Sequence, residues 1–283
     1  MNLTNINDIK ALLGRHGFHF SKSMGQNFLI ESWVPHDIAE SAKLDDNCGV
    51  MEIGPGIGPL TQQLAMRAKK VASIELDRDL LPILEETMAP YPNVEIIPGD
   101  AMKLNFNELT SEKFEGLDVK ACANLPYNIT TPIITKMLEA KCFSTITVMI
   151  QREVAKRICA MPGDPDCGAF SLFCQYHAEC ELLFEVPPEC FIPAPKVTSA
   201  VIRLTPRSAP PVDVDENALF TVIKAAYAQR RKTLLNGLTA AYGNRFSKEE
   251  LRQFIVDCGL PETVRGERLS LEDFASLSKS LHP

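Results

Sequence analysis

Seven short apolar runs recur along the chain, and most of them are rich in β-branched residues. They cover residues 49–53, 71–76, 94–97, 118–123, 145–150, 180–186 and 200–204. The intervals between the first five runs are long enough for helices, for example over residues 60–68, 80–88 and 132–140. This alternation predicts an α/β fold with a mostly parallel sheet and helices on both faces. The last two runs lack an obvious long crossover helix, which predicts an antiparallel edge.

A proline-rich break ends this pattern. No convincing strand follows the segment Pro206-Arg207-Ser208-Ala209-Pro210-Pro211. Four later stretches instead read as helices, at residues 219–230, 232–241, 248–258 and 271–280. Ser247 and Glu250 have the spacing of a capping box at the start of the third. We therefore predict a larger domain over residues 1–206 and a small all-helical domain over residues 207–283.

Composition narrows the class of protein. Among the 283 residues, 45% are hydrophobic and 23% charged, as in ordinary soluble globular proteins. Residues 1–10 lack a signal-peptide pattern and no apolar run has membrane-spanning length, so we expect a cytoplasmic protein. The nine cysteines include no CxxC pair, and their loose cluster between residues 159 and 190 matches no common zinc module, so we predict no metal. The net charge of −7 argues against a general nucleic-acid binder, although local basic stripes can still contact phosphates.

The tetrapeptide Asn124-Leu125-Pro126-Tyr127 follows the fourth strand, where open α/β folds place their chemistry. Asn124 offers a side-chain carbonyl as a hydrogen-bond acceptor. Pro126 restricts Leu125 to extended backbone and helps to aim a nearby carbonyl outward, while Tyr127 can stack on a planar base. Two acceptors of this kind would hold an aromatic amine and point its lone pair at an electrophile. A proline turn beside a buried tyrosine is the alternative interpretation.

A glycine-rich loop and three acids mark the ends of the first three strands. The loop Glu52-Ile53-Gly54-Pro55-Gly56-Ile57-Gly58 allows close approach of a ligand, but its spacing is not that of the dinucleotide fingerprint, and a tight turn would explain it equally. Glu52, Glu75 and Asp100 would repel a pyrophosphate and attract the net positive charge of S-adenosylmethionine. The acidic lining therefore favours S-adenosylmethionine, with Glu75 placed for the ribose hydroxyls and Asp100 for the adenine amine. Each acid alone could instead cap a helix.

An ordered set of motifs resembles the KsgA family of rRNA adenine N6-dimethyltransferases, from about residue 20 to residue 277. The motifs are Gln26-Asn27-Phe28-Leu29, the loop from Glu52, Glu75, Gly99-Asp100-Ala101, the tetrapeptide from Asn124, the segment Phe191–Ser199 and Gln229-Arg230-Arg231-Lys232-Thr233-Leu234. The resemblance implies a Rossmann-like S-adenosylmethionine-dependent methyltransferase sheet with a small C-terminal helical domain. It also implies dimethylation of two adjacent adenosines in a hairpin loop near the 3′ end of small-subunit (16S) rRNA. A role in small-subunit assembly, a pre-assembled small subunit as substrate and a monomeric state follow from the same resemblance.

The resemblance also implies roles for individual residues. The residues that would hold and stack the flipped adenine are Asn124, Leu125, Pro126, Tyr127 and Phe191. The residues that would bind the cofactor are Asn27, Leu29, Gly54, Gly56, Glu75, Leu76, Asp100, Ala101 and Asn124. The residues that would contact RNA are Arg230, Arg231, Lys232, Lys196 and Arg152. Phe191 could instead be a core residue, and charge runs are usually only solvated surfaces.

Methyl transfer to a neutral amine needs no strong base, so we expect catalysis to come from positioning and electrostatics. None of the five histidines clusters with acids in the sequence, which fits this expectation. Three other functions compete: a resistance-type methyltransferase of large-subunit rRNA, a non-catalytic RNA-binding factor on the same fold, and a small-molecule methyltransferase. The intact Glu75, Asp100 and Asn124–Tyr127 positions argue against the second, and the helical tail argues against the third.

Overall fold

The computed structural model describes residues 1–18, 26–229 and 232–282, and the chain divides into two compact units. The first unit comprises Met1–Ala155 and Glu179–Pro206, and the second comprises Lys156–Ala178 and Arg207–Pro283. The sequence break after Pro206 coincides with one boundary between the units. The structure additionally assigns Lys156–Ala178 to the second unit, a grouping for which the sequence gives no compositional signal.

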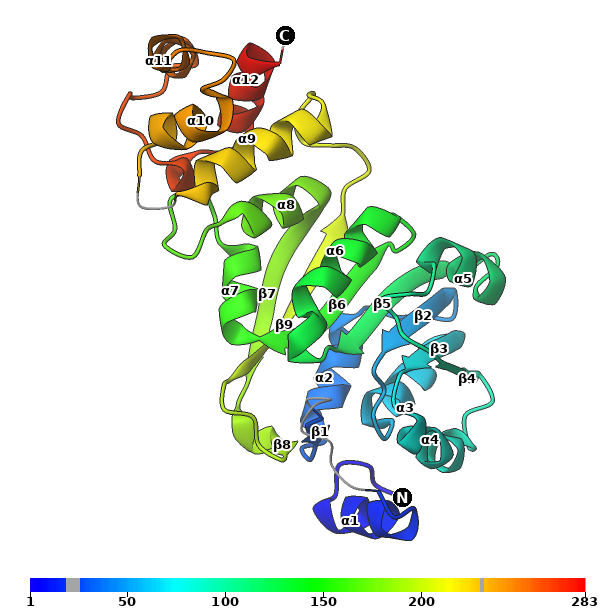
Figure 1. The fold of residues 1–283 in the computed structure, drawn as a ribbon. Coiled ribbons are helices and arrows are strands. Elements are labelled where there is room, and N and C mark those ends of the chain that lie inside the picture. The colour runs from blue at the N-terminus through cyan, green and yellow to red at the C-terminus, as the bar shows by residue number, and fades with distance from the viewer. Residues whose placement is uncertain (19–25, 230–231, 283) are drawn as a thin grey trace. The chain divides into compact units, whose positions relative to one another are not determined.

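The first unit is built on a seven-stranded sheet (Figure 1). Its strands are β2 (Cys48–Ile53), β3 (Lys70–Glu75), β4 (Val94–Pro98), β5 (Asp118–Asn124), β6 (Thr145–Gln151), β7 (Ala178–Val186) and β9 (Ser199–Pro206). Their spatial order is β4-β3-β2-β5-β6-β9-β7. The strands from β4 to β6 are parallel, whereas β9 pairs antiparallel with β6. The predicted parallel sheet with an antiparallel addition is therefore confirmed.

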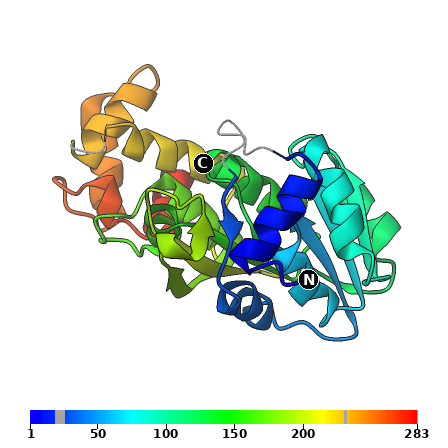
Figure 2. The same cartoon turned by 90° about the horizontal axis from the view of Figure 1, so that it is seen from below.

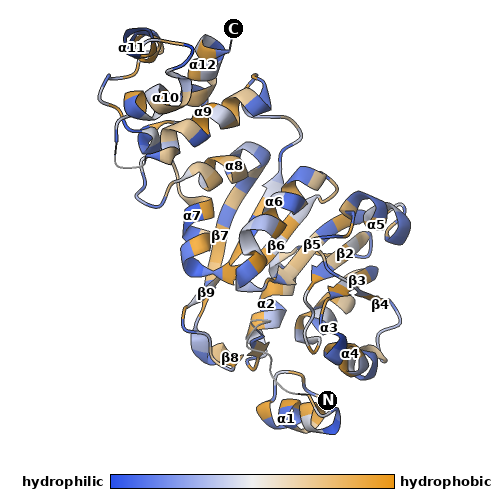
Figure 3. Cartoon of the chain, in the orientation of Figure 1, coloured by the Kyte–Doolittle hydropathy of each residue, from blue (hydrophilic) through white to orange (hydrophobic). Residues whose placement is uncertain are grey.

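Helices pack against this sheet because its central strands are apolar on both faces. The helices of the first unit are α1 (Ile6–Arg15), α2 (Trp33–Ser41), α3 (Pro59–Ala65), α4 (Leu81–Met88), α5 (Phe106–Lys113), α6 (Thr130–Ala140) and the start of α7 (Arg152–Cys159). Every residue of β2 is buried, as expected for a parallel strand covered on both sides. Figure 3 shows hydrophobic colour along β6 and a mixture of both colours on α6, which is typical of a helix with one face on the core.

The N-terminal helix α1 is an element that the sequence patterns did not predict. Its residues Ile9 and Leu12 are buried against Ile83 and Leu84 of α4 (Figure 2, α1 in dark blue). The same apolar cluster contains Phe28, from a short strand described below. Burial against α4 explains why ten residues suffice for a stable helix, since isolated helices of this length are marginal in water.

The second unit is helical, as predicted for the C-terminal part. Its helices are the end of α7, α8 (Ala169–His177), α9 (Glu216–Ala228), α10 (Leu234–Tyr242), α11 (Lys248–Asp257) and α12 (Leu271–Leu281). The capping box at Ser247 and Glu250 forms with both reciprocal hydrogen bonds. A single apolar cluster, including Leu219 and Phe274, holds these helices together. In the described part of the chain, no helix is both long enough and apolar enough to cross a membrane.

Candidate active site

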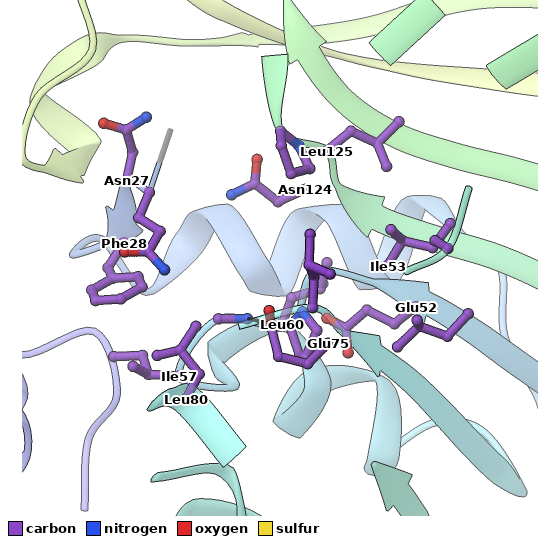
Figure 4. Close-up of a pocket in the computed structure, with 18 of the residues that line it drawn as sticks. Asn27, Phe28, Glu52, Ile53, Ile57, Leu60, Glu75, Leu80, Asn124 and Leu125 are labelled. Carbon is purple, nitrogen blue, oxygen red and sulfur yellow. Dashed lines mark hydrogen bonds between the residues drawn. The ribbon is translucent and has the colours of Figure 1, made fainter. Parts of the chain in front are cut away.

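A pocket lies at the carboxyl ends of β2, β3, β4 and β5, within the first unit (Figure 4). The carboxyl ends of parallel strands meet at one edge of a sheet, so residues distant in sequence converge there. The lining of the pocket includes every residue predicted to bind the cofactor or to hold and stack the target adenine. These residues are Asn27, Leu29, Gly54, Gly56, Glu75, Leu76, Asp100, Ala101, Asn124, Leu125, Pro126, Tyr127 and Phe191.

The glycine loop reaches the pocket through left-handed backbone. Gly54 has φ +69° and Gly56 has φ +62°, a region that L-residues with a side chain rarely adopt. The Gly54 N–H donates to the Ile74 carbonyl at 3.0 Å, which fixes the loop against β3. The loop therefore has a defined shape, and its backbone can approach a ligand closely.

Glu75, at the end of β3, is held by backbone donors on both carboxylate oxygens. The Gly56 N–H donates to Oε2 at 3.3 Å, and the Asp77 N–H donates to Oε1 at 2.8 Å. The residue is only 6% exposed, and burial raises the pKa of its carboxyl, while these two N–H groups oppose the shift. Glu75 is thus a fixed acceptor that borders the pocket and can take hydroxyl donors.

Glu52 differs from the other two strand-end acids. It is 1% exposed, and its Oε2 accepts from Thr61 Oγ1 at 2.7 Å and from Ser73 Oγ at 2.6 Å. Burial is the main cause that raises its pKa to about 7, and the charge of Glu75 adds to the effect. The expected lining of three negative charges is therefore reduced near neutral pH. The carboxylates of Glu75 and Asp100 carry the attraction for a cation.

The loop after β4 presents Asp100 and Ala101. The Asp100 Oδ1 accepts from the Met102 N–H at 2.9 Å, and Lys103 Nζ lies 3.8 Å from Oδ2. Leu76 lines the same pocket and is 55% exposed. An exposed apolar side chain and a carboxylate acceptor in one pocket suit a planar base that carries an amino group.

In the tetrapeptide, the Asn124 side-chain amide and the Pro126 backbone carbonyl differ in their hydrogen bonding. Asn124 is the last residue of β5, and its side-chain amide has no hydrogen-bond partner among the described residues. In Figure 4 the side chains of Asn124 and Leu125 leave the strand end in opposite directions. The Pro126 carbonyl accepts from the Ile129 N–H and from Thr130 Oγ1, both at 3.2 Å, so its two lone pairs are used within the turn. The Pro126 carbonyl is therefore disfavoured as the second amine acceptor.

The two aromatic candidates differ in environment. Tyr127 is half-buried, and its hydroxyl is 2.7 Å from Ser199 Oγ; burial raises the pKa of this phenol. Phe191 is only 4% exposed and packs in an apolar cluster with Leu29. Leu29 and Phe191 are paired in a small antiparallel sheet formed by β1 (Phe28–Leu29) and β8 (Phe191–Ile192). Phe191 is therefore both a core residue and a pocket residue.

Among the predicted RNA-contacting cations, the described residues Arg152, Lys196 and Lys232 do not line the pocket. Arg152 lies 3.5 Å from Glu185 and 3.8 Å from Glu153, while Lys196 and Lys232 are exposed. Arg230 and Arg231 lie outside the described residues. No group of three or more His, Cys, Asp or Glu side chains in the described ranges is arranged to hold a metal ion.

The apolar wall of the pocket was not predicted from the sequence. Ile57, Leu60 and Leu80 line it and are nearly fully buried. Ile57 and Leu60 lie within or just after the glycine loop, so their proximity to the motif was an available signal. Leu80, in a 3-10 turn before α4, had no such signal.

The chain is similar to known proteins over nearly its whole length. The family model described as ribosomal RNA adenine dimethylase matches residues 17–282. The ribosomal RNA small subunit methyltransferase A of a Geobacillus strain is 46% identical, covering 96% of this chain and 95% of that protein. The protein of the same name from Bacillus cytotoxicus is 48% identical, covering 98% and 96%.

Two solved structures share the fold. A dimethyladenosine transferase from Plasmodium falciparum has a TM-score of 0.73 and 25% identity, covering 88% of this chain and 95% of its own. The 23S rRNA methyltransferase ErmE has a TM-score of 0.70 and 25% identity, covering 90% and 100%. The same architecture therefore occurs in a protein named as a dimethyladenosine transferase and in one named for 23S rRNA.

Proposed function

The chain belongs to the ribosomal RNA adenine dimethylase family, and we infer from this membership that it is an S-adenosylmethionine-dependent enzyme that dimethylates adenine in small-subunit rRNA. The observation that carries the proposal is the pocket, which is lined by the glycine loop, the Glu75 carboxylate and the Asn124 amide, an amide without a hydrogen-bond partner among the described residues. The curated relatives, named for the small subunit, favour that rRNA over the large-subunit rRNA in the name of ErmE.

The residues that line the pocket fit the cofactor. The buried Glu75 carboxylate keeps acceptor capacity for ribose hydroxyls, and Asp100 with Leu76 suits the adenine ring. Gly54 and Gly56 would lie against the methionine part, and Asn27 and Leu29 would close the pocket from the N-terminal side. When bound, S-adenosylmethionine supplies an electrophilic methyl group and a positive charge, which the carboxylates Glu75 and Asp100 attract.

Asn124 and the Leu125 carbonyl would accept hydrogen bonds from the target amine. Holding both N–H groups in this way reduces conjugation of the nitrogen lone pair with the ring and aims it into the pocket. After methylation the nitrogen loses a proton to these acceptors or to water, so no dedicated base is required. For the second methyl group, one acceptor must suffice. Mass spectrometry of the product tests this, because exclusive accumulation of monomethyladenosine would contradict it.

Stacking would hold the flipped adenine between Tyr127 and Phe191. An unpaired loop base has a low cost of leaving its stack, which suits the proposed hairpin near the 3′ end of 16S rRNA with its two adjacent adenosines. Because the target belongs to a folded RNA, we further propose a pre-assembled small subunit as the substrate and a role in its biogenesis. A monomeric enzyme in the cytoplasm would meet that particle.

Cationic residues would contact the RNA backbone: Arg152, Lys196, Arg230, Arg231 and Lys232. We assign the last three the largest share, because they form one run in the helical domain, residues 207–283. Replacing this run by glutamine should weaken rRNA binding and reduce its salt dependence, while S-adenosylmethionine binding stays intact. Unchanged RNA affinity at several salt concentrations would contradict the assignment.

One experiment separates the candidate functions. The protein is incubated with methyl-labelled cofactor and with undermethylated small subunits, large subunits or free adenosine, and the label is mapped. Label on small-subunit rRNA adenines as N6,N6-dimethyladenosine is expected. Label on large subunits would instead favour the function named for ErmE, label on adenosine would favour a small-molecule enzyme, and no label would favour a non-catalytic factor.

A further inference from the structure

Lys136, on α6, donates to three backbone carbonyls of the loop that follows β4. Its Nζ is 2.9 Å from the Ala101 oxygen, 2.7 Å from that of Met102 and 2.6 Å from that of Leu104. An ammonium has three N–H donors, so these carbonyls use all of them. The same Nζ lies 4.8 Å from the ring centroid of Phe106, a favourable position for a cation.

These three carbonyls belong to the turn that presents Asp100 and Ala101 to the pocket. Within the turn, Asp100 Oδ1 accepts from the Met102 N–H, and the Asp100 carbonyl accepts from the N–H groups of Lys103 and Leu104. This folding directs several carbonyl dipoles toward one point, where they repel one another unless a cation lies between them. Burial lowers the pKa of Lys136, while the charge of Asp100 opposes the shift, which places both groups in one electrostatic cluster.

The same helix anchors the tetrapeptide. α6 begins at Thr130, immediately after the 3-10 turn Tyr127–Ile129, and the Thr130 hydroxyl donates to the Pro126 carbonyl at 3.2 Å. Lys136 lies less than two helical turns further on. One rigid element therefore connects the loop assigned to the cofactor's adenine with the turn assigned to the target amine.

We propose that Lys136 is a positioning residue for the cofactor, whose ammonium holds the Asp100–Leu104 turn in the conformation that presents Asp100 and Ala101 to the pocket. The proposal rests on the proposed function, because it takes this turn to contact S-adenosylmethionine. It assigns Lys136 no contact with the cofactor itself, since its donors are used by the turn.

The test compares Lys136→Met with Lys141→Met, a change at an exposed lysine directly after the same helix. Calorimetry should show S-adenosylmethionine binding weakened about 10- to 100-fold by Lys136→Met, the range for losing hydrogen bonds to a charged group, and by less than about 2-fold by Lys141→Met. Hydrogen exchange on the cofactor-free protein should show faster exchange of the Met102, Lys103 and Leu104 amides in Lys136→Met alone. This second measurement reports on the turn without any bound ligand.

A double-mutant cycle with Asp100→Ala separates positioning from a general loss of stability. If Lys136 acts through the turn, its replacement should weaken binding much less in the Asp100→Ala background than in the wild type. Additive losses, or wild-type affinity and exchange in Lys136→Met, would overturn the proposal. If Lys136→Met does not fold, Lys136→Gln, which keeps two donors, replaces it in the same three measurements. Failure of the wild type to bind S-adenosylmethionine would contradict the proposed function instead.

Discussion

On the side of the pocket formed by β3 and β4, the polar groups are fixed by hydrogen bonds within the chain, whereas on the side formed by β5 the Asn124 amide has no such partner among the described residues. Glu75 is held by two backbone N–H groups, and the turn at Asp100 is held by Lys136. Groups fixed in advance bind a ligand without an ordering cost, and a free amide is available to a substrate that arrives later. The difference supports the proposal of a cofactor site that is preformed and an amine site that the target base completes.

The strongest test of this comparison is Asn124→Ala. Because no described residue pairs with the amide, its removal should leave the free energy of unfolding almost unchanged. Methyl transfer should fall about 100- to 1,000-fold, the effect of deleting one positioned hydrogen-bonding group at a reaction centre. Single-turnover rates with undermethylated small subunits measure this, with chemical unfolding as the control. A large loss of stability with an unaltered rate would reverse the roles of the two sides.

Glu75→Ala tests the preformed side. Removing a charged acceptor should weaken S-adenosylmethionine binding about 10- to 150-fold, because hydrogen bonds to a charged group contribute about 1.5–3 kcal/mol. Glu75→Gln keeps the shape and one acceptor oxygen, so its affinity should lie between those of Glu75→Ala and the wild type. Calorimetry with and without RNA measures both variants. A defect that appears only with RNA present would mean that this side, too, is completed by the substrate.

The aromatic residues sharpen the comparison, because only one of them belongs to the core. Tyr127→Leu and Phe191→Leu should each reduce methylation at limiting RNA about 5- to 150-fold, from stacking of about 1–3 kcal/mol per base. Phe191→Ala should also destabilise the fold by about 3–5 kcal/mol, since a buried ring leaves a cavity. Thermal unfolding separates the two effects. If Phe191→Leu methylates like the wild type, Phe191 acts only in the core.

The parallel sheet and most of the pocket were predictable because strand ends obey a simple geometric rule. Apolar runs locate the strands, and the residues after β2, β3, β4 and β5 must then lie at one edge. Glu75, Asp100 and Asn124 follow from this rule without knowledge of any distance. The antiparallel β9 also follows, because no crossover helix precedes it.

Other features depend on tertiary contacts that no local pattern records. The second unit takes residues 156–178 from the middle of the chain, because Leu172 and Tyr176 bury their side chains with α9. In the sequence, nothing distinguishes Lys136 from other lysines in helices. Its role depends on the fold, which brings the turn at Asp100 beside it. Likewise, the Pro126 carbonyl accepts one hydrogen bond within its own turn, from the Ile129 N–H, and gains the second only where Thr130 begins α6.

Glu52 allows the test with the smallest expected effect, because this side chain is fixed by hydrogen bonds within the chain and has a raised pKa. Burial raises its pKa to about 7 in the folded protein from an ordinary value of 4.5. At pH values between these two pKa values, Glu52 keeps a proton in the folded protein that it has lost in the unfolded chain. The contribution of this protonation to the free energy of unfolding is therefore complete below pH 4.5 and is lost as pH rises through 7. At about 1.4 kcal/mol per pH unit, the loss is on the order of 3 kcal/mol.

Glu52→Gln should remove this part of the pH dependence, whereas the exposed Glu115→Gln should not. Chemical unfolding at several pH values between 5 and 8 would therefore give a shallower decline for Glu52→Gln than for the wild type and the control. Equal slopes for all three proteins would mean that Thr61 and Ser73 stabilise a charged Glu52 against its burial. The third negative charge expected from the sequence would then be restored to the pocket, and its attraction for a cationic cofactor would be correspondingly larger.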